Sequence, residues 1–128
     1  MSVIASCVCK SVIFELSGEL RDVVFCNCSQ CRKTSGHFWA ATQVSEENLN
    51  FVKALSLSWY ESSDKARRGF CNRCGSSMFY ERKDIDKISV AAGSLQIPTS
   101  LEQMRHIYVG SKGDYYDILD NLPKFDEY

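Results

Sequence analysis

The residues best suited to chemistry are three cysteines within six residues, Cys26, Cys28 and Cys31. They directly follow residues 22–25, a run typical of a short β-strand. Thiols this close together are too crowded to be separate core residues or to pair with one another, and they suit one metal ion. Three ligands leave a tetrahedral zinc ion with an open position, which is the arrangement of a catalytic site.

The other four cysteines divide into two pairs. Cys71 and Cys74, followed by Gly75, have the spacing of a zinc knuckle, in which a tight turn points two sulfurs at one ion. Cys7 and Cys9 are the remaining pair, and alternate side chains of an extended strand share one face. We therefore predict a closed four-cysteine site and a separate three-cysteine site.

Other interpretations of these cysteines remain open at the level of sequence. Cys71 and Cys74 alone would suit a redox dithiol, although no βαβ pattern surrounds them. The group of three would also suit a structural metal with His37 or His106 as fourth ligand, or reactive thiols without metal. Neither histidine lies at ligand spacing from the three cysteines, which favours the open position.

Composition limits the class of protein. A length of 128 residues, with 45% hydrophobic and 24% charged residues, predicts one globular domain over residues 1–128. The formal net charge of −1 argues against nonspecific binding to nucleic acid or to anionic membranes. The sequence has no signal-peptide pattern and no apolar run of membrane-spanning length, which predicts a cytoplasmic protein. In a reducing compartment, seven cysteines favour metal ligation over disulfides.

The elements that position these cysteines are expected to be short strands. Apolar runs bounded by glycine and polar residues predict strands at 12–16, 22–25, 38–44, 78–82 and 87–92. Alternation at 49–52 and 55–60 predicts that one face of each strand lies on a core. Residues 100–104 suggest a helical turn, 106–109 a last strand, and 122–125 an apolar clasp at the end of the domain. The fold class is mostly β.

The sequence resembles the family of glutathione-dependent formaldehyde-activating enzymes, which also contains the centromere protein V domain. The resemblance is carried by residues 7–9, 26–36, 70–76, 93–95 and 122–125. It implies an Mss4-like fold of small antiparallel sheets and short helical turns, stapled by zinc. It also implies two zinc ions, a structural one at Cys7, Cys9, Cys71 and Cys74 and a catalytic one at Cys26, Cys28 and Cys31. The chain departs from the family pattern at Lys10, Asn27 and Gln96, where Gly, His and Asp are frequent.

The activity that this resemblance implies is the condensation of glutathione with formaldehyde, a carbon-sulfur lyase reaction in reverse. Zinc bound by three thiolates is a weak Lewis acid, so it suits binding of a substrate thiol better than the generation of hydroxide. A glutathione-like thiol and a small aldehyde are the expected partners, with no nucleic acid and no membrane.

Polar residues near the three cysteines are candidates for binding and proton transfer. Arg32 and Lys33 would offset thiolate charge or hold a carboxylate of glutathione, unless they are an ordinary solvated pair. Arg67 and Arg68 are further candidates of the same kind, and His37 is the nearest proton donor in sequence. The rival functions are a zinc-stabilised binding module for a protein partner and an enzyme of this architecture that acts on another thiol adduct. A cavity at the three-cysteine site would favour an enzyme over the binding module.

Overall fold

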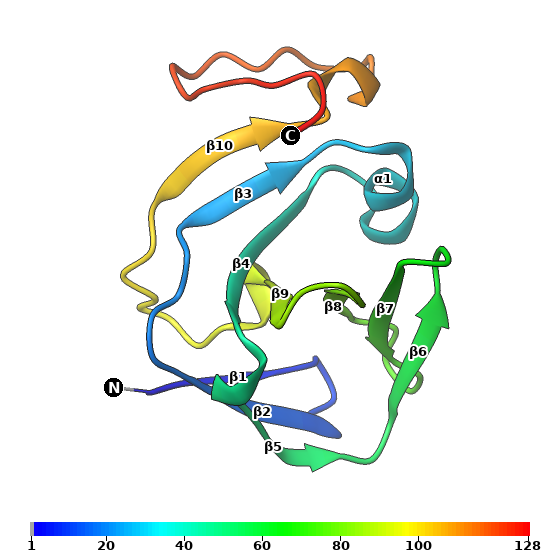
Figure 1. Cartoon of the computed structure of the whole chain (residues 1–128), viewed down its shortest axis with the longest axis vertical. Helices are drawn as coiled ribbons and strands as arrows, with labels where there is room; N and C mark the ends of the chain where they lie inside the picture. The colour runs from blue at the N-terminus through cyan, green and yellow to red at the C-terminus, as the bar shows by residue number, and fades with distance from the viewer. Residues whose placement is uncertain (1) are drawn as a thin grey trace.

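The computed structural model describes residues 2–128, which form two β-sheets and one short α-helix (Figure 1). The smaller sheet has the order β1-β2-β5, with bounds Ser2–Ser6, Val12–Ser17 and Leu49–Ala54. The larger has the order β10-β3-β4-β9-β8-β7-β6, with bounds Gln103–Ile107, Val23–Cys26, Trp39–Ser45, Lys87–Ala91, Ser77–Arg82, Ala66–Cys71 and Leu57–Glu61. The helix α1 is Ser29–Ser35, and 3₁₀ turns cover Glu46–Asn48, Ala92–Ser94 and Val109–Ser111. The prediction of a mostly β fold is confirmed.

The hydrophobic core joins the two sheets. Along β2, buried side chains alternate with half-buried ones, as expected for a strand with one face on a core. The ring of Phe14 from β2 lies 4.9 Å from that of Phe79 on β8, centroid to centroid. Met78 and Val90, from β8 and β9, complete the contact between the sheets. This packing fixes how β1 and β2 sit against the larger sheet.

The predicted core face of residues 49–52 is present, but it lies at the margin of the core, where Leu49 and Phe51 contact it. In β5 only Leu49 is even half-buried, and Phe51, with 42% of its surface exposed, reaches the rings of Phe14 and Phe79. The strand lies at the edge of the smaller sheet, so little of the molecule covers it. In β6, also an edge strand, Leu57 and Trp59 are half-buried and pack against the core, as the alternation predicts.

The helical turn predicted at 100–104 is also wrong. Residues from Gln103 onward belong to β10, which pairs in parallel with β3, whereas the other strand pairs within 2–128 are antiparallel. The segment after β10 folds back along it. There His106 donates its backbone N–H to Pro123 and accepts from that of Phe125, at 3.0 Å each. The predicted apolar clasp therefore lies against β10.

No helix within residues 2–128 has the length and apolar character needed to cross a membrane.

Candidate active site

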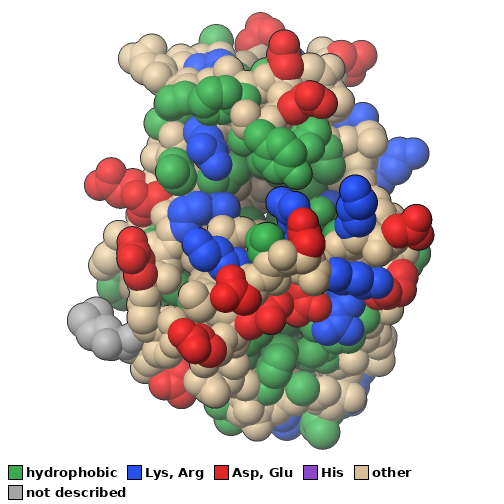
Figure 2. Space-filling model, in the orientation of Figure 1, with side chains coloured by type: hydrophobic (Ala, Val, Ile, Leu, Met, Phe, Trp, Pro, Cys, Tyr) green, Lys and Arg blue, Asp and Glu red, His purple; other side chains and the backbone are tan. Residues whose placement is uncertain are grey.

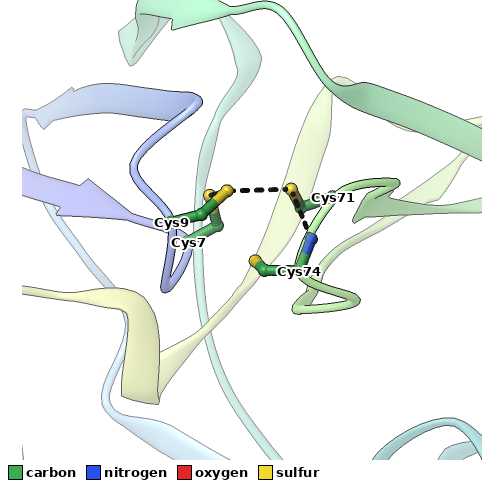
Figure 3. A group of neighbouring side chains, drawn as sticks. All are labelled: Cys7, Cys9, Cys71 and Cys74. Atoms are coloured by element: carbon green, nitrogen blue, oxygen red, sulfur yellow. Dashed lines mark hydrogen bonds between the residues drawn. The ribbon is translucent and has the colours of Figure 1, made fainter.

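Four cysteine sulfurs converge between two loops, as Figure 3 shows. Cys7 and Cys9 follow β1, Cys71 ends β7, and Cys74 lies in the turn before β8. The Sγ atom of Cys9 lies 3.7 Å from that of Cys7 and 3.7 Å from that of Cys71. Four sulfurs about 2.3 Å from one zinc ion would lie about 3.8 Å apart in a tetrahedron. The spacing therefore fits a closed zinc site and not an isolated dithiol.

Two left-handed turns shape this four-cysteine site. Lys10 has φ 63° and Gly75 has φ 79°, a region that glycine enters without strain. The backbone N–H of Gly75 donates to the carbonyl of Cys71 at 2.8 Å and closes the knuckle. The conformation of Lys10 gives a physical reason for the frequent glycine at this position of the family pattern.

Hydroxyl and amide donors favour the thiolate form in the four-cysteine site. Burial alone would raise the pKa of Cys71, but hydrogen bonds outweigh it and lower that pKa to about 5. The donors include the Ser56 hydroxyl, 3.0 Å from the sulfur, and the backbone N–H of Cys74, at 3.4 Å. A hydrogen bond from Ser76 similarly lowers the pKa of Cys74 to about 7. Thiolates are the form that binds metal.

The second cluster contains Cys26, Cys28 and Cys31, whose sulfurs all lie within 4.8 Å of one another. Cys26 ends β3, Cys28 is the N-cap of α1, and Cys31 lies in its first turns. The Sγ atom of Cys28 accepts the backbone N–H of Cys31 at 3.3 Å. At the other end of α1, Gly36 adopts φ 88° and caps the helix on the carbonyl of Arg32. The strand-to-helix connection thus aims three thiols at one point.

Contacts within this three-cysteine cluster divide its charge unequally. Hydrogen bonds from Cys26 and Cys31 lower the pKa of Cys28, and the hydrogen bond with Cys28 raises the pKa of Cys26. No fourth His, Cys, Asp or Glu side chain joins the group among residues 2–128.

The three-cysteine cluster opens into a cavity of about 750 Å³. Its wall beside the sulfurs includes Cys26, Cys28, Cys31, Trp39, Arg68 and Tyr80. Figure 2 shows a hollow near the middle of this face of the molecule, with Lys and Arg side chains gathered around it. A bound metal ion would thus face a space large enough for a small organic molecule.

Arg68 lies directly against the cluster. It is only 6% exposed, and its Nη2 donates to the Sγ of Cys31 at 3.5 Å. Its Nε donates to the side-chain oxygen of Gln30 at 2.6 Å, and its guanidinium lies 4.8 Å from the centre of the Tyr80 ring. If the three cysteines held a divalent ion as thiolates, a buried positive charge at this place would offset their excess negative charge.

Arg67 points away from the cavity, although it neighbours Arg68 in sequence. Its guanidinium lies 3.9 Å from the centre of the Trp59 ring and pairs with Glu81 at 2.7 Å. Successive side chains of β7 face opposite sides of the sheet, which explains why only one of the two arginines meets the cysteines.

The other polar candidates lie outside the cavity wall. Arg32 donates from Nε to the carbonyl of Ser111 at 2.7 Å, and Lys33 is exposed on α1. The Nδ1 of His37 contacts the hydroxyl of Tyr115. His106 pairs with Asp120 at 2.8 Å. The structure brings none of them to the three sulfurs.

Asn27 lies between two of the clustered cysteines but faces the other way. It is 1% exposed, and its amide donates to the carbonyls of Phe25 and Ile107 at 3.3 and 3.2 Å. Its side-chain oxygen accepts from the Tyr116 hydroxyl at 2.8 Å. Asn27 therefore ties β3 to β10 and to the C-terminal segment. Where the family pattern frequently has His, this chain has a structural hydrogen-bonding residue.

Arg21 and Arg105 also line the cavity, and sequence analysis did not identify them. Arg21 lies just before β3, and Arg105 lies in β10. The two are far apart in sequence, and both are outside every cysteine motif. Arg105 reaches the cavity because β10 pairs in parallel with β3, which places Arg105 opposite Val24. Local pattern does not reveal such a pairing.

Together these features define a class of protein: a small β domain with one closed and one open cysteine cluster, the open one in a basic cavity. The chain belongs to the glutathione-dependent formaldehyde-activating enzyme family, which it matches over residues 2–111. Among solved structures, a crystal structure of a Rhodobacter sphaeroides protein is similar, with a TM-score of 0.63 and 24% identity. The alignment covers 81% of this chain and 100% of that one, and it supports the fold alone. No curated protein sequence matches the chain.

Proposed function

We propose that this protein is a zinc-dependent carbon-sulfur lyase that joins a glutathione-like thiol to a small aldehyde such as formaldehyde. The observation that carries the proposal is the opening of the three-cysteine cluster into the basic cavity. The family's name supports the same reaction class. The compartment is proposed to be cytoplasmic, where glutathione is abundant and thiols stay reduced.

Cys26, Cys28 and Cys31 are the proposed ligands of the catalytic zinc, and Cys7, Cys9, Cys71 and Cys74 those of the structural zinc. When bound by three thiolates, zinc offers an open position at which a substrate thiol loses its proton and stays nucleophilic. Arg68 holds Cys31 by its hydrogen bond and balances the negative charge of the cluster. Trp39 and Tyr80 line the same space.

The proposed reaction balances without a redox partner. A bond forms between the thiol sulfur and the aldehyde carbon, the carbonyl π electrons move to oxygen, and the thiol proton ends on that oxygen. The product is a hemithioacetal, and the same site would release the thiol and aldehyde in the reverse direction. The residues of the cavity need only hold the two reactants in contact.

The cavity favours this enzyme over a binding module in which both metals serve only the fold. A purely structural zinc is closed by four protein ligands. Within residues 2–128 the three-cysteine cluster has no fourth candidate side chain, and all three cysteines line the cavity.

The test is exchange spectroscopy by NMR on mixtures of glutathione and formaldehyde, with the uncatalysed condensation as reference. The protein should accelerate interconversion of free glutathione and its hydroxymethyl adduct, and metal analysis should give two zinc ions per chain. An exchange rate equal to the reference in protein that carries both metals would refute the proposed activity.

A further inference from the structure

The cavity carries far more positive than negative charge. Its cationic lining residues are Arg21, Arg68, Arg82, Lys87 and Arg105, and among the lining side chains only Asp86 carries a carboxylate. Two of the five are accounted for, since Arg82 pairs with Asp84 at 2.7 Å and Arg68 serves the cysteine cluster. Of the other three, Lys87 is exposed, whereas Arg21 and Arg105 are half-buried.

Arg21 and Arg105 have no carboxylate partner among residues 2–128, although the guanidinium of Arg105 lies 5.9 Å from the centre of the Phe125 ring. Arg21 donates only to backbone carbonyls, those of Ala41 at 3.0 Å and Asp22 at 3.2 Å. The Nε of Arg105 is buried without any hydrogen-bond partner. Buried polar groups are rarely left without a hydrogen-bond partner, so an unpaired one suggests that a ligand normally supplies the partner.

The two guanidinium groups also act on each other. Burial lowers the pKa of Arg21, and the nearby charge of Arg105 lowers it further. Two like charges at one site are unfavourable unless an anion lies between or beside them. The strands hold them together nonetheless, because Arg21 is fixed to Ala41 of β4 and Arg105 is paired opposite Val24 of β3.

The strand registers give the distance from this arginine pair to the cysteines. Val24 pairs with Ala41 on one side and Arg105 on the other, whereas Cys26 pairs with Trp39 and Ile107. Two residues along a strand correspond to about 7 Å and return to the same face of the sheet. The arginine pair and the open cluster thus share one wall of the cavity, separated by the length of a small peptide-like molecule.

We propose that Arg21 and Arg105 form a carboxylate-binding subsite, which selects thiols whose carboxylate lies several bonds from the sulfur, as in glutathione. Guanidinium groups bind carboxylates with two parallel hydrogen bonds, and here two such groups line the same cavity, with the Nε of Arg105 unpaired. The subsite rests on the proposed function, because it assumes that the sulfur of the same molecule occupies the three-cysteine site. A simple thiol without a carboxylate should therefore bind more weakly than glutathione.

The binding test uses S-methylglutathione, which keeps both carboxylates but has no free thiol. Isothermal titration calorimetry should show binding to the metal-loaded protein, and Arg105→Gln should weaken it about tenfold or more. Arg105→Lys keeps the charge but not the planar fork, and should recover part of the loss. Arg21→Gln should repeat the effect of Arg105→Gln. Lys53→Gln removes a surface charge on β5 and should change nothing. Absent binding to the parent protein, or equal affinity for Arg105→Gln, would overturn the subsite.

A second probe separates this subsite from the proposed function. Adding 2-mercaptoethanol to cobalt-loaded protein should change the sulfur-to-cobalt absorption equally in the parent and in Arg105→Gln. If it changes neither while S-methylglutathione binding still depends on Arg105, the thiol site is wrong and the carboxylate subsite stands. If the absorption responds in both but S-methylglutathione binding ignores Arg105, the thiol site stands and the subsite is wrong.

Discussion

The two cysteine clusters of this protein present the same ligand in two different settings. In the four-cysteine site, ligands from loops more than 60 residues apart meet between the two sheets, since Cys9 and Cys71 are 62 positions apart. In the three-cysteine site, all ligands come from one six-residue stretch between β3 and α1. A metal ion in the first would hold distant segments together, whereas one in the second would hold only a local turn.

The two clusters also differ in the charge of the groups around them. Neutral donors surround the first cluster, namely serine hydroxyls and backbone N–H groups such as those at Ser56 and Cys74. The buried guanidinium of Arg68 and a basic cavity adjoin the second. The number of ligands, the sequence distance between them and access to the cavity thus separate the proposed structural site from the proposed catalytic one.

The largest effect is expected from Cys71→Ser. Losing one ligand of the four-cysteine site should release its metal and separate the sheets, because the metal closes a long loop. We expect the melting temperature to fall by more than about 15 °C, measured by circular dichroism together with metal analysis. The control is Val8→Ala, which changes a side chain that is 84% exposed between two ligands. A folded Cys71→Ser protein with one metal and an unchanged melting temperature would contradict the structural role.

Cys28→Ser should instead leave a folded protein with one metal ion and little activity. Serine is a good helix N-cap, so the start of α1 keeps its hydrogen bond to the N–H of Cys31. We expect thiol-aldehyde exchange to fall at least about 100-fold, with the melting temperature almost unchanged. Retention of both metals, or unfolding of this variant, would erase the distinction between the two clusters.

Ser56→Ala should weaken the four-cysteine site without destroying it. Removing this donor raises the pKa of Cys71, so protons compete better with metal at any given pH. The pH at which half the metal is released should therefore move upward, and metal affinity should fall about tenfold. Ser58→Ala is the matched control, because its hydroxyl contacts Asn72 and no cysteine. Competition with a chromophoric chelator over a pH series measures both variants, and a downward shift would contradict the assignment.

The smallest effect is expected from Tyr116→Phe. This change removes the hydrogen bond to the buried oxygen of Asn27 and should cost about 1 kcal/mol of unfolding free energy. Activity should not change, because neither side chain lines the cavity. Denaturant titration against Tyr60→Phe, an exposed tyrosine, gives the comparison. Loss of metal from the three-cysteine site would instead mean that Asn27 acts on the ligands.

Much of the site followed from sequence because ligand spacing is local. The pairs at 7 and 9 and at 71 and 74, and the group of three, are brought together as their spacing suggested, and metal ligation remains the prediction. The mostly β fold was equally accessible from short alternating runs. The helix α1 was not foreseen, because it has only seven residues, a cysteine as its N-cap and no apolar period.

The residues that line the cavity could not be predicted from the sequence, because their positions depend on strand pairing and register. Arg105 acquires its place only through the parallel pairing of β10 with β3, about 80 residues away in sequence. Arg68 differs from Arg67 only in the face of β7 it occupies, which depends on the register of that strand. The exposure of β5 likewise depends on its place at the edge of a sheet rather than on its own residues.

The spacing of the ligands also bears on the order in which the chain takes up metal. Three thiols within six residues can chelate an ion before any tertiary structure exists, because the loop they close is very short. The other four meet only once β1, β2 and β7 have assembled. During refolding with cobalt, we expect the absorption of the three-cysteine site first and that of the four-cysteine site in step with folding. The proposed catalytic metal would then bind before the chain folds, and the proposed structural metal would bind as folding is completed.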